Sequence, residues 1–556
     1  MYERLSVMST HHIVKDDYRN SLLHSQMLFD FIDKILLEST LNNDNDDDTW
    51  MEKLFAWADN HNIPPLEYYD YLQAEDSTDD SLEKIPKGFP RDKKTLKKIT
   101  KLNLSYITLK NLPPEIGELH NLTELNLYHS NLSKLPMEIT KLKKLTKLSL
   151  GSNLFTHLPV ELTTLTNLQE LNLSRNKLKK LSPGFENLTN LVHLHLSYNH
   201  FTLLPKSLFT LHNLETLNLK SNKLTELPRE IGELSQLQKL DLGINNLTQL
   251  PAEIGHLMNL TTLNVTQGNR FSSLPREIGF LFKLTKLDLE NHNLSEVPSE
   301  IGNLTNLSEL NLANNFIKEL PEEIGNLTYL KKLDLEGNLL EALPPQIGNL
   351  YSLLELDIGA NQLKQLPQEI GNLTNLTLLD IKGHRRENYA IWGNKLRELP
   401  DSISQLTELS ELNFWKNRLI KFPLALIPLN NLTKLGLALN YIKSLPPEIG
   451  EMSNLTELSL QGNLLSTLPP EIGNLKKLIW FNLYNNHITT LPIEIAALQE
   501  LSLLNLEKNN LTKLPAEISQ LENIRELNLK ENSIKLSSRL QAWIKTLRIT
   551  SYKIYV

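Results

Sequence analysis

Few residues in this 556-residue chain have the types and spacing that metal chemistry requires. Asp44, Asp46 and Asp48 are spaced like the start of a calcium-binding loop. Thr49 stands where such a loop needs glycine, and Phe55 where it needs a bidentate glutamate. A solvated acidic linker is therefore the better interpretation of this run.

Catalytic constellations are also missing from the sequence. The 15 histidines never form H-E-x-x-H, and the adjacent pair His11–His12 lies near the amino terminus. His193 and His195 have no serine or aspartate that the sequence pattern places beside them. The phosphate-loop pattern G-x-x-x-x-G-K-[ST] is absent, and the chain has no cysteine for a disulfide, a zinc ligand or a nucleophile. We predict no enzyme, no metal and no cofactor.

The charge is unevenly distributed along the chain. Residues 1–80 hold 5 Lys and Arg against 18 Asp and Glu, out of 57 and 65 in the whole chain, so the remainder holds 52 against 47. That near balance gives no electrostatic case for nucleic acid. No apolar run reaches the roughly 18–20 residues of a membrane span, and the first residues lack a secretory signal. We expect a cytoplasmic protein, with export by a route without a signal left open.

A repeat of 23 residues organises most of the sequence. The strings LTKLSLGSN, LQELNLSRN and LVHLHLSYN share the pattern L-x-x-L-x-L-x-x-N, whose nine positions we call slots one to nine. Slot nine recurs nineteen times between Ile107 and Asn532 and holds Asn in sixteen repeats; Ile107, Ser130 and His292 are the exceptions. Seventeen of the 27 prolines occupy one later position, in x-L-x-x-L-P.

This pattern predicts short strands followed by turns. Leucines in slots four and six point to one face of a strand, and the slot-nine Asn can satisfy backbone groups where the chain leaves it. Proline then ends the pairing, and the I-G-x-L segment returns on the opposite side. Because one repeat cannot bury its own leucines, repeats must stack. We predict an α/β solenoid with one parallel sheet on a concave wall.

The consensus LxxLxLxxNxLxxLPxEIGNLxxL resembles the leucine-rich repeat family. It is most similar to the 23-residue class of bacterial repeat proteins, animal Ras-pathway scaffolds and plant intracellular Ras-group proteins. The resemblance covers residues 99–536. It implies a horseshoe of about nineteen repeats that binds proteins through its concave face, and little more about function.

The regions flanking the repeats predict helical caps. We expect residues 1–80 to be an acidic, mainly helical region, 81–98 an amino-terminal cap or linker, and 537–556 a carboxy-terminal cap. Thr49 and Glu52 suggest a capping box for a helix in the first region. Two apolar stripes at helical spacing support these helices: Leu28, Phe31, Ile32, Ile35 and Leu36, and Leu540, Trp543, Ile544 and Leu547.

An insertion of ten residues interrupts the thirteenth repeat at about 384–393, with the sequence HRRENYAIWG. Insertions in solenoids become loops on one rim. This loop is rich in residue types that are common at interfaces, and its candidate binding residues are His384, Arg385, Arg386, Tyr389 and Trp392.

The concave face is predicted to carry alternating charges that pair across neighbouring strands. Slot three reads Lys101, Glu124, Lys147, Glu170, and later Lys286, Glu309, Lys332, Glu355. We predict the partner-binding site in the repeats where apolar residues replace these charges on the concave face and small residues lie between aromatic ones. Its candidate residues are Leu378, Trp415, Gly436, Ala438, Leu439, Trp480, Tyr484 and Leu503.

A secondary cluster of candidate residues lies in the early repeats. It contains Tyr106, Tyr128, His129, His193, His195 and Tyr198. These residue types favour a second binding surface, and the alternative is that they receive the acidic amino-terminal region.

The predicted function is therefore a protein–protein interaction module whose partner the sequence does not name. The alternative is a regulatory scaffold or a secreted bacterial effector that acts on a signalling protein such as a small GTPase or its regulator. The resemblance to Ras-pathway scaffolds motivates this alternative. The oligomeric state is not predicted.

Overall fold

The structure is a computed structural model that describes residues 48–66, 87–385, 391–549 and 553–555. The chain forms two compact units, residues 1–246 and 247–556, which we describe separately. The predicted helix with Leu28, Phe31, Ile32, Ile35 and Leu36 lies outside the described residues, as do His11, His12, Asp44 and Asp46.

The first unit contains helices α2 (Thr49–Asn60) and α3 (Lys93–Lys98) and then seven repeats. Their strands are β1 (Lys101–Asn103), β2 (Glu124–Asn126), β3 (Lys147–Ser149), β4 (Glu170–Asn172), β5 (His193–His195), β6 (Thr216–Asn218) and β7 (Lys239–Asp241). Short 3₁₀ helices follow the strands: η1 (Pro114–Glu118), η2 (Met137–Lys141), η3 (Val160–Thr164), η4 (Phe185–Asn187), η5 (Lys206–Thr210) and η6 (Arg229–Glu233).

The second unit holds twelve further repeats and the carboxy-terminal elements. Its strands are β8 (Thr262–Asn264), β9 (Lys286–Asp288), β10 (Glu309–Asn311), β11 (Lys332–Asp334), β12 (Glu355–Asp357), β13 (Leu378–Asp380), β14 (His384–Arg385), β15 (Ile391–Trp392), β16 (Glu411–Asn413), β17 (Lys434–Gly436), β18 (Glu457–Ser459), β19 (Trp480–Asn482), β20 (Leu503–Asn505), β21 (Glu526–Asn528) and β22 (Lys553–Tyr555). Its helices are η7 (Ala252–His256), η8 (Arg276–Phe280), η9 (Ser299–Asn303), η10 (Glu322–Asn326), η11 (Pro345–Asn349), η12 (Gln368–Asn372), η13 (Asp401–Gln405), η14 (Leu424–Leu426), η15 (Pro447–Glu451), η16 (Pro470–Asn474), η17 (Ile493–Ala497), η18 (Ala516–Gln520) and α4 (Ser538–Ile549).

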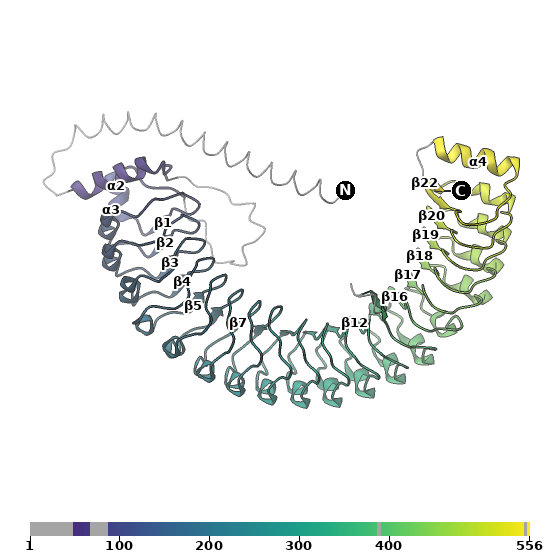
Figure 1. The fold of residues 1–556 in the computed structure, drawn as a ribbon, viewed down its shortest axis with the longest axis horizontal. Helices are drawn as coiled ribbons and strands as arrows, with labels where there is room; N and C mark the ends of the chain where they lie inside the picture. The colour runs from purple at the N-terminus through teal and green to yellow at the C-terminus, as the bar shows by residue number, and fades with distance from the viewer. Residues whose placement is uncertain (1–47, 67–86, 386–390, 550–552, 556) are drawn as a thin grey trace. The chain divides into compact units, whose positions relative to one another are not determined.

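The predicted solenoid fold is confirmed. Within each unit the repeat strands pair in parallel with their sequence neighbours, and equivalent slots face each other, as in Lys332↔Glu355. Strands line one side of each unit and 3₁₀ helices the other (Figure 1). Leucines in slots four and six are buried, for example Leu333 and Leu335. Slots three, five and seven carry side chains on the opposite side of the strands, which we call the strand face.

The slot-nine asparagines join consecutive repeats by buried hydrogen bonds. Asn338 donates from Nδ2 to the carbonyl oxygens of Leu312 at 2.9 Å and Leu335 at 3.0 Å, and its Oδ1 accepts from the N–H of Ile317 at 3.1 Å. Ser130, an exception in the pattern, still donates to the carbonyl of Leu104 at 3.0 Å. Since buried backbone groups need partners, this ladder fixes the turn that leaves each strand.

Slot eight has a backbone conformation that the sequence pattern did not indicate. Its residue has positive φ in repeat after repeat, for instance 59° at Tyr106, 56° at Asn314 and 63° at Lys416. The left-handed region favours Gly and Asn, yet this slot holds many residue types. The asparagine ladder and the strand pairing on either side therefore impose the conformation.

Ile244 is the residue least suited to slot eight, because a β-branched side chain at φ 53° is strained. We expect Ile244→Asn to raise the free energy of unfolding by about 1 kcal/mol, since asparagine tolerates this conformation. Asn314 and Asn485 already occupy the slot at φ 56° and 54°. Urea unfolding checks the prediction, with Ile244→Val as the control that keeps the branch. An unchanged or lower midpoint for Ile244→Asn would contradict it.

On the helical side, proline and glycine have distinct roles. Pro344 takes an extended conformation directly before η11, and the 3₁₀ helix was not predicted as such. A Cβ atom added to Gly348 would overlap the carbonyl oxygen of Glu369 in the next repeat. The glycine is therefore needed because adjacent 3₁₀ helices pack with backbone against backbone.

The amino-terminal helix α2 packs on the first repeat. Met51, Leu54 and Ala58 are fully buried, and Trp57 donates from Nε1 to the carbonyl of Asn111 at 2.9 Å. The expected capping box is wrong: the helix begins at Thr49, and Asp48 is the N-cap residue without a side-chain cap bond. The Asp48 carboxylate instead lies 3.1 Å from the Nζ of Lys97 on α3, which ties the two helices together.

At the other end, α4 carries the predicted apolar stripe, and Leu540, Ile544 and Leu547 are buried. The helix packs against η18 and β22. Strand β22 adds to the sheet in parallel beside β21, a strand that the sequence analysis did not predict. No helix among the described residues is long and apolar enough to cross a membrane.

The insertion in repeat 13 is more regular than the expected loop. Its two ends form the antiparallel strands β14 and β15, with His384 opposite Trp392 and Arg385 opposite Ile391. Arg386 and Tyr389 lie outside the described residues. The N–H of Gly383, just before β14, donates to the carbonyl of Trp415 at 2.7 Å, so the hairpin starts beside Trp415.

Candidate functional site

The paired charges predicted for slot three are present on the strand face. The Nζ–carboxylate distances are 2.9 Å for Lys101–Glu124, 3.2 Å for Lys147–Glu170, 2.6 Å for Lys286–Glu309 and 2.9 Å for Lys332–Glu355. These side chains are partly exposed, so water screens each pair and its contribution to stability is small. Lysine and glutamate here satisfy each other, which leaves little unpaired charge for a partner.

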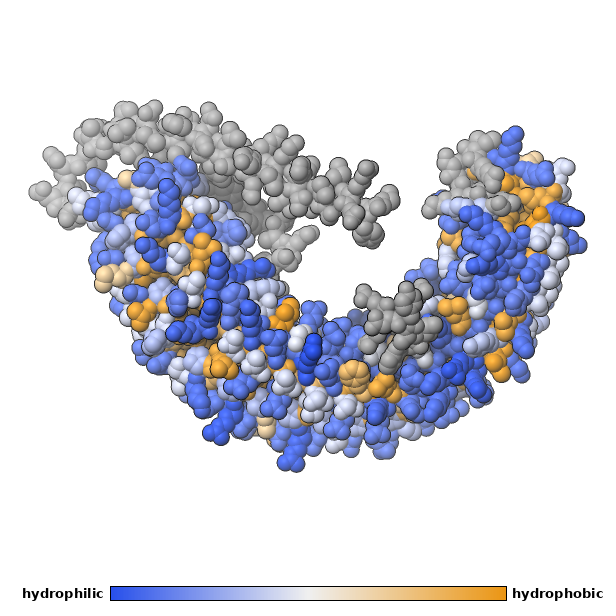
Figure 2. All heavy atoms as spheres, in the orientation of Figure 1, coloured by the Kyte–Doolittle hydropathy of each residue, from blue (hydrophilic) through white to orange (hydrophobic). Residues whose placement is uncertain are grey.

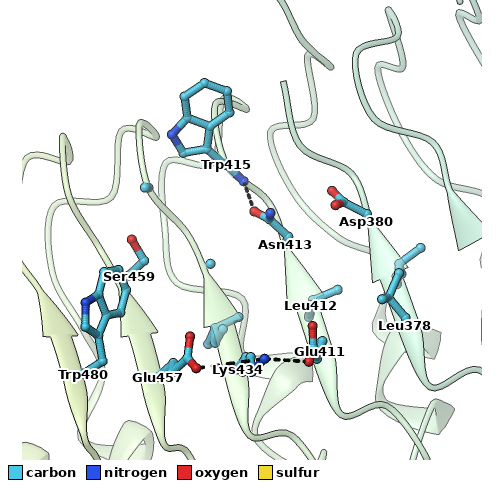
Figure 3. Close-up of a pocket in the computed structure, with 14 residues that line it drawn as sticks. Leu378, Asp380, Glu411, Leu412, Asn413, Trp415, Lys434, Glu457, Ser459 and Trp480 are labelled. Atoms are coloured by element: carbon cyan, nitrogen blue, oxygen red, sulfur yellow. Dashed lines mark hydrogen bonds and ion pairs between the residues drawn. The ribbon is translucent and has the colours of Figure 1, made fainter. Parts of the chain in front are cut away.

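The row of alternating Lys and Glu in slot three is interrupted between β13 and β19 by Leu378 and Trp480, and the strand face has a cavity there. The cavity has a volume of about 280 Å³, and we call it the aromatic hollow. Trp415, which follows β16, and Trp480 on β19 stand on opposite sides of it, with Ser459 between them on β18 (Figure 3). The two tryptophans are three strand steps apart, or about 14 Å across the sheet, and Trp415 in slot seven also lies four positions farther along the strand direction than Trp480 in slot three.

Small residues make the floor between the tryptophans. Gly436 on β17 has no side chain to fill the space, and a Cβ there would come within 2.8 Å of Asn413 Oδ1. Ala438 and Ser459 continue the floor. The N–H of Trp415 donates to Asn413 Oδ1 at 3.0 Å, which fixes the turn that presents the indole. The hollow is therefore built from the backbone as well as from side chains.

Charged groups border the aromatic hollow on the same strands. Lys434 lies 2.8 Å from Glu411 and 3.9 Å from Glu457, and the hydrogen bond to Glu411 raises the pKa of its ammonium group. Asp380 also lines the hollow and pairs with Lys382 at 2.7 Å. Sequence reasoning missed these polar lining residues, although slots three and five of the strands concerned carry them.

The structure brings together five of the eight predicted concave-face residues. Leu378, Trp415, Gly436, Ala438 and Trp480 all line the aromatic hollow. Leu439 does not, because it lies in slot eight at φ 51°, beyond the strand. Leu503 lies beside Trp480 on the next strand, and Tyr484 approaches Lys508, with 3.4 Å from its hydroxyl to Nζ. These three residues lie outside the hollow.

A second cavity on the strand face was not predicted. It has a volume of about 270 Å³ and is lined by residues of β9 to β13; we call it the acidic hollow. Asp288, Asp334 and Asp357 face it from slot five, where many other repeats have Asn. Burial raises the pKa of all three, and that of Asp357 reaches about 7 with a further contribution from Asp380.

The secondary cluster forms only in part. The rings of Tyr106, Tyr128 and His129 converge, with centroids 5.5 Å apart for the tyrosines and 5.3 Å for Tyr106 and His129. His193 and His195 lie on β5, three strands from Tyr128. Tyr198 instead stacks under Arg175, whose guanidinium carbon is 4.3 Å from the ring centroid.

His292 is a buried exception in the asparagine ladder of the second unit. It is 3% exposed, and its ring stacks on Phe271 with centroids 4.5 Å apart. Burial lowers the pKa of His292 to about 4, although the carbonyls of Val265 and Asn269 act in the opposite direction. Among the described residues no group of three or more His, Asp or Glu is placed to hold a metal ion.

Comparisons with known proteins identify the family. The description "Leucine-rich repeat region" matches residues 90–200, 229–315 and 310–388, and "Leucine rich repeat" matches residues 189–247, 430–488 and 453–511. The chain belongs to the leucine-rich repeat family. No match was found among the curated proteins.

Solved structures agree with this assignment. A leucine-rich repeat protein from Leptospira interrogans is 34% identical, with 83% of this chain and 98% of that chain covered and a TM-score of 0.53. The plant peptide hormone receptor RGFR1, solved in complex with RGF2, is 31% identical over 81% of each chain, with a TM-score of 0.62. The Arabidopsis receptor kinase HAESA ectodomain, solved with an IDA peptide hormone ligand, is 25% identical over 82% of this chain and 85% of that chain, with a TM-score of 0.53.

Proposed function

We propose that this protein is a non-enzymatic binding module that holds a protein or peptide partner on its strand face, centred on the aromatic hollow. The observation that carries the proposal is the pair Trp415 and Trp480 on either side of a floor of small residues. Tryptophan, with tyrosine and arginine, is enriched among the residues that carry most of the binding energy at protein interfaces. An interface of about 800 Å² per partner needs only a few repeats.

Two further observations support this function. Slot three of β9 to β12 carries lysines and glutamates that already pair with one another, whereas slot three of β13 and β19 carries Leu378 and Trp480 of the aromatic hollow. Related structures of the family contain peptide hormones. The insertion hairpin begins beside Trp415, so we propose that His384, Arg385, Arg386, Tyr389 and Trp392 border the same interface. The Tyr106, Tyr128 and His129 cluster is a candidate second surface.

The setting of this function is also a proposal. A cytoplasmic location is supported by a sequence without cysteine, and a bacterial source by the 34% identity to the Leptospira protein. The alternative role, a scaffold or effector acting on a small GTPase or its regulator, rests on the family resemblance, and no feature of the described residues favours it.

The experiment is affinity capture of partners by the full chain and by a Trp415→Asp, Trp480→Asp variant. We expect the variant to recover at least tenfold less of the specific partner, because both anchors become charged. The matched control is Tyr329→Asp with Tyr351→Asp, since these aromatics are 66% and 53% exposed outside the strand face. Equal recovery by the tryptophan variant and the wild type would contradict the proposal.

A further inference from the structure

The aromatic and acidic hollows form one continuous surface. Leu378, at the start of β13, lines both cavities. Both cavities also lie on the same face of one parallel sheet within the second unit. A partner segment that crosses the strands over the aromatic hollow therefore reaches the acidic hollow next.

The acidic hollow has more carboxylates than cations. Its lining contains two lysines and five carboxylates. Both lysines are already paired, Lys286 with Glu309 at 2.6 Å and Lys332 with Glu355 at 2.9 Å. Asp288, Asp334 and Asp357 have no partner in these two lysines, so the lining is negative in proportion to their ionisation, which burial shifts to higher pH by raising the pKa of all three.

These aspartates are held in place by the backbone. Asp334 accepts at Oδ1 from the N–H of Glu336 at 2.9 Å, and Asp357 accepts at Oδ1 from the N–H of Gly359 at 2.8 Å. Strand register sets Asp334 beside Asp357 and Asp357 beside Asp380. Lys382 approaches the last two, at 3.6 Å from Asp357 and 2.7 Å from Asp380, whereas Asp334 makes no ion pair within the described residues. Lys382 is thus the one lysine within ion-pair distance of the adjacent carboxylates of Asp334, Asp357 and Asp380 in the described residues, and it reaches two of the three.

We propose that the partner segment is extended and carries two anchors: a large apolar side chain between Trp415 and Trp480, and a Lys or Arg side chain beside Asp334 and Asp357. This inference rests on the proposed function and specifies the chemistry of its partner. Charge complementarity selects a basic segment, since an acidic one would add to the excess of carboxylates. The other possible occupants are a neutral segment and a globular surface without an extended stretch.

The geometry sets the spacing of the two anchors. The middle of the aromatic hollow, at Gly436 on β17, is three strand steps from Asp357 and four from Asp334. At the spacing of a sheet this is about 14–19 Å. An extended chain covers that distance in about four to six residues.

The test is selection of a random 12-residue phage-displayed peptide library on the immobilised full chain. We expect selected peptides to carry an aromatic or large aliphatic residue about four to six positions from a Lys or Arg. A synthetic copy of the best peptide is then measured by fluorescence anisotropy. Its Kd is expected to rise at least tenfold in a variant with Asp334→Asn and Asp357→Asn, and to rise with salt. Asn311 and Asn413 occupy the equivalent slot, so this variant should fold.

The matched control is Glu322→Gln with Glu323→Gln, which removes two charges from the exposed helix η10 and should leave Kd unchanged. Neutral or acidic selected peptides, no selected peptide, or an unchanged Kd in the aspartate variant would each overturn the inference. The Trp415→Ala, Trp480→Ala variant separates the two proposals. If it weakens binding while the aspartate variant does not, the basic anchor is wrong and the proposed function stands. If neither variant weakens binding, both are wrong.

Discussion

Replacing His292 with asparagine should protect the protein from mild acid. Because burial lowers the pKa of His292 to about 4, the folded state excludes a proton that the unfolded chain binds below about pH 6.5. The contribution of His292 to stability is thus intact above pH 6.5 and is lost as the pH falls toward 4. The loss is about 2 kcal/mol at pH 5 and about 3 kcal/mol at pH 4.

Asparagine is the residue that this slot holds in sixteen repeats, so His292→Asn should fold normally and supply the ladder bonds without a titrating ring. Urea unfolding at pH 7.5 and pH 5 measures the effect. The variant is expected to gain about 2 kcal/mol over the wild type on going to pH 5. His157→Asn is the control, since His157 is exposed. The same difference between variant and wild type at both pH values would show that His292 does not titrate in this range.

Asp357→Asn should stabilise the protein at neutral and alkaline pH. Burial and the neighbouring Asp380 raise the pKa of Asp357 to about 7, so the folded state favours the protonated carboxyl. The stability that Asp357 contributes is therefore full below about pH 4 and is lost as the pH rises to 7. Asparagine has no charge to bury and keeps an acceptor for the N–H of Gly359, so we expect a gain of about 4 kcal/mol at pH 7.5.

The gain of Asp357→Asn should fall below about 1 kcal/mol at pH 4 and vanish near pH 3, where the carboxyl is protonated in the folded and the unfolded wild type alike. Glu355→Gln on the same strand is the control for removing one charge, because that side chain is 44% exposed and paired with Lys332. It should change stability by less than about 1 kcal/mol at either pH. A variant Asp357→Asn that is less stable than the wild type at pH 7.5 would contradict the account.

His292 and Asp357 act in opposite directions over the same pH range. Between pH 7.5 and 5, protonation of His292 in the unfolded chain lowers the free energy of unfolding by about 2 kcal/mol, and protonation of Asp357 in the folded protein raises it by a similar amount. Both residues lie in the second unit. The two effects should therefore nearly cancel in the wild type over this pH range. In each single variant, the free energy of unfolding should depend on pH through the one titrating residue that remains.

Much of the fold follows from the repeat because one physical requirement recurs nineteen times. Leucines of slots four and six need a shared core, and the slot-nine amide needs the backbone of the preceding repeat, so strand register is determined. The left-handed slot eight could not be read from the sequence, since Tyr106 and Ile244 have no preference for it. Tertiary contacts impose that conformation, and the sequence pattern does not record them.

The candidate site was predictable where it depends on two features of the repeat: side chains that alternate between the two faces of a strand, and the register between neighbouring strands. Trp415 and Trp480 were expected on one face three strands apart, and they lie there. Leu439 was expected at the same site, but it lies in slot eight at φ 51° and does not line the aromatic hollow. The acidic hollow was missed because Asp for Asn is a small change in sequence, whereas its effect depends on the burial of Asp288, Asp334 and Asp357, the last two on adjacent strands.

Site-specific photo-crosslinking tests the central claim most directly. A benzophenone amino acid replaces Leu503, next to Trp480 at the edge of the aromatic hollow, or Tyr351 outside the strand face. We expect irradiation in cells to join one partner to position 503 and not to position 351. We also expect Trp415→Asp with Trp480→Asp to remove this crosslinked product. A partner joined only through position 351, or an undiminished product in the tryptophan variant, would contradict binding on the strand face.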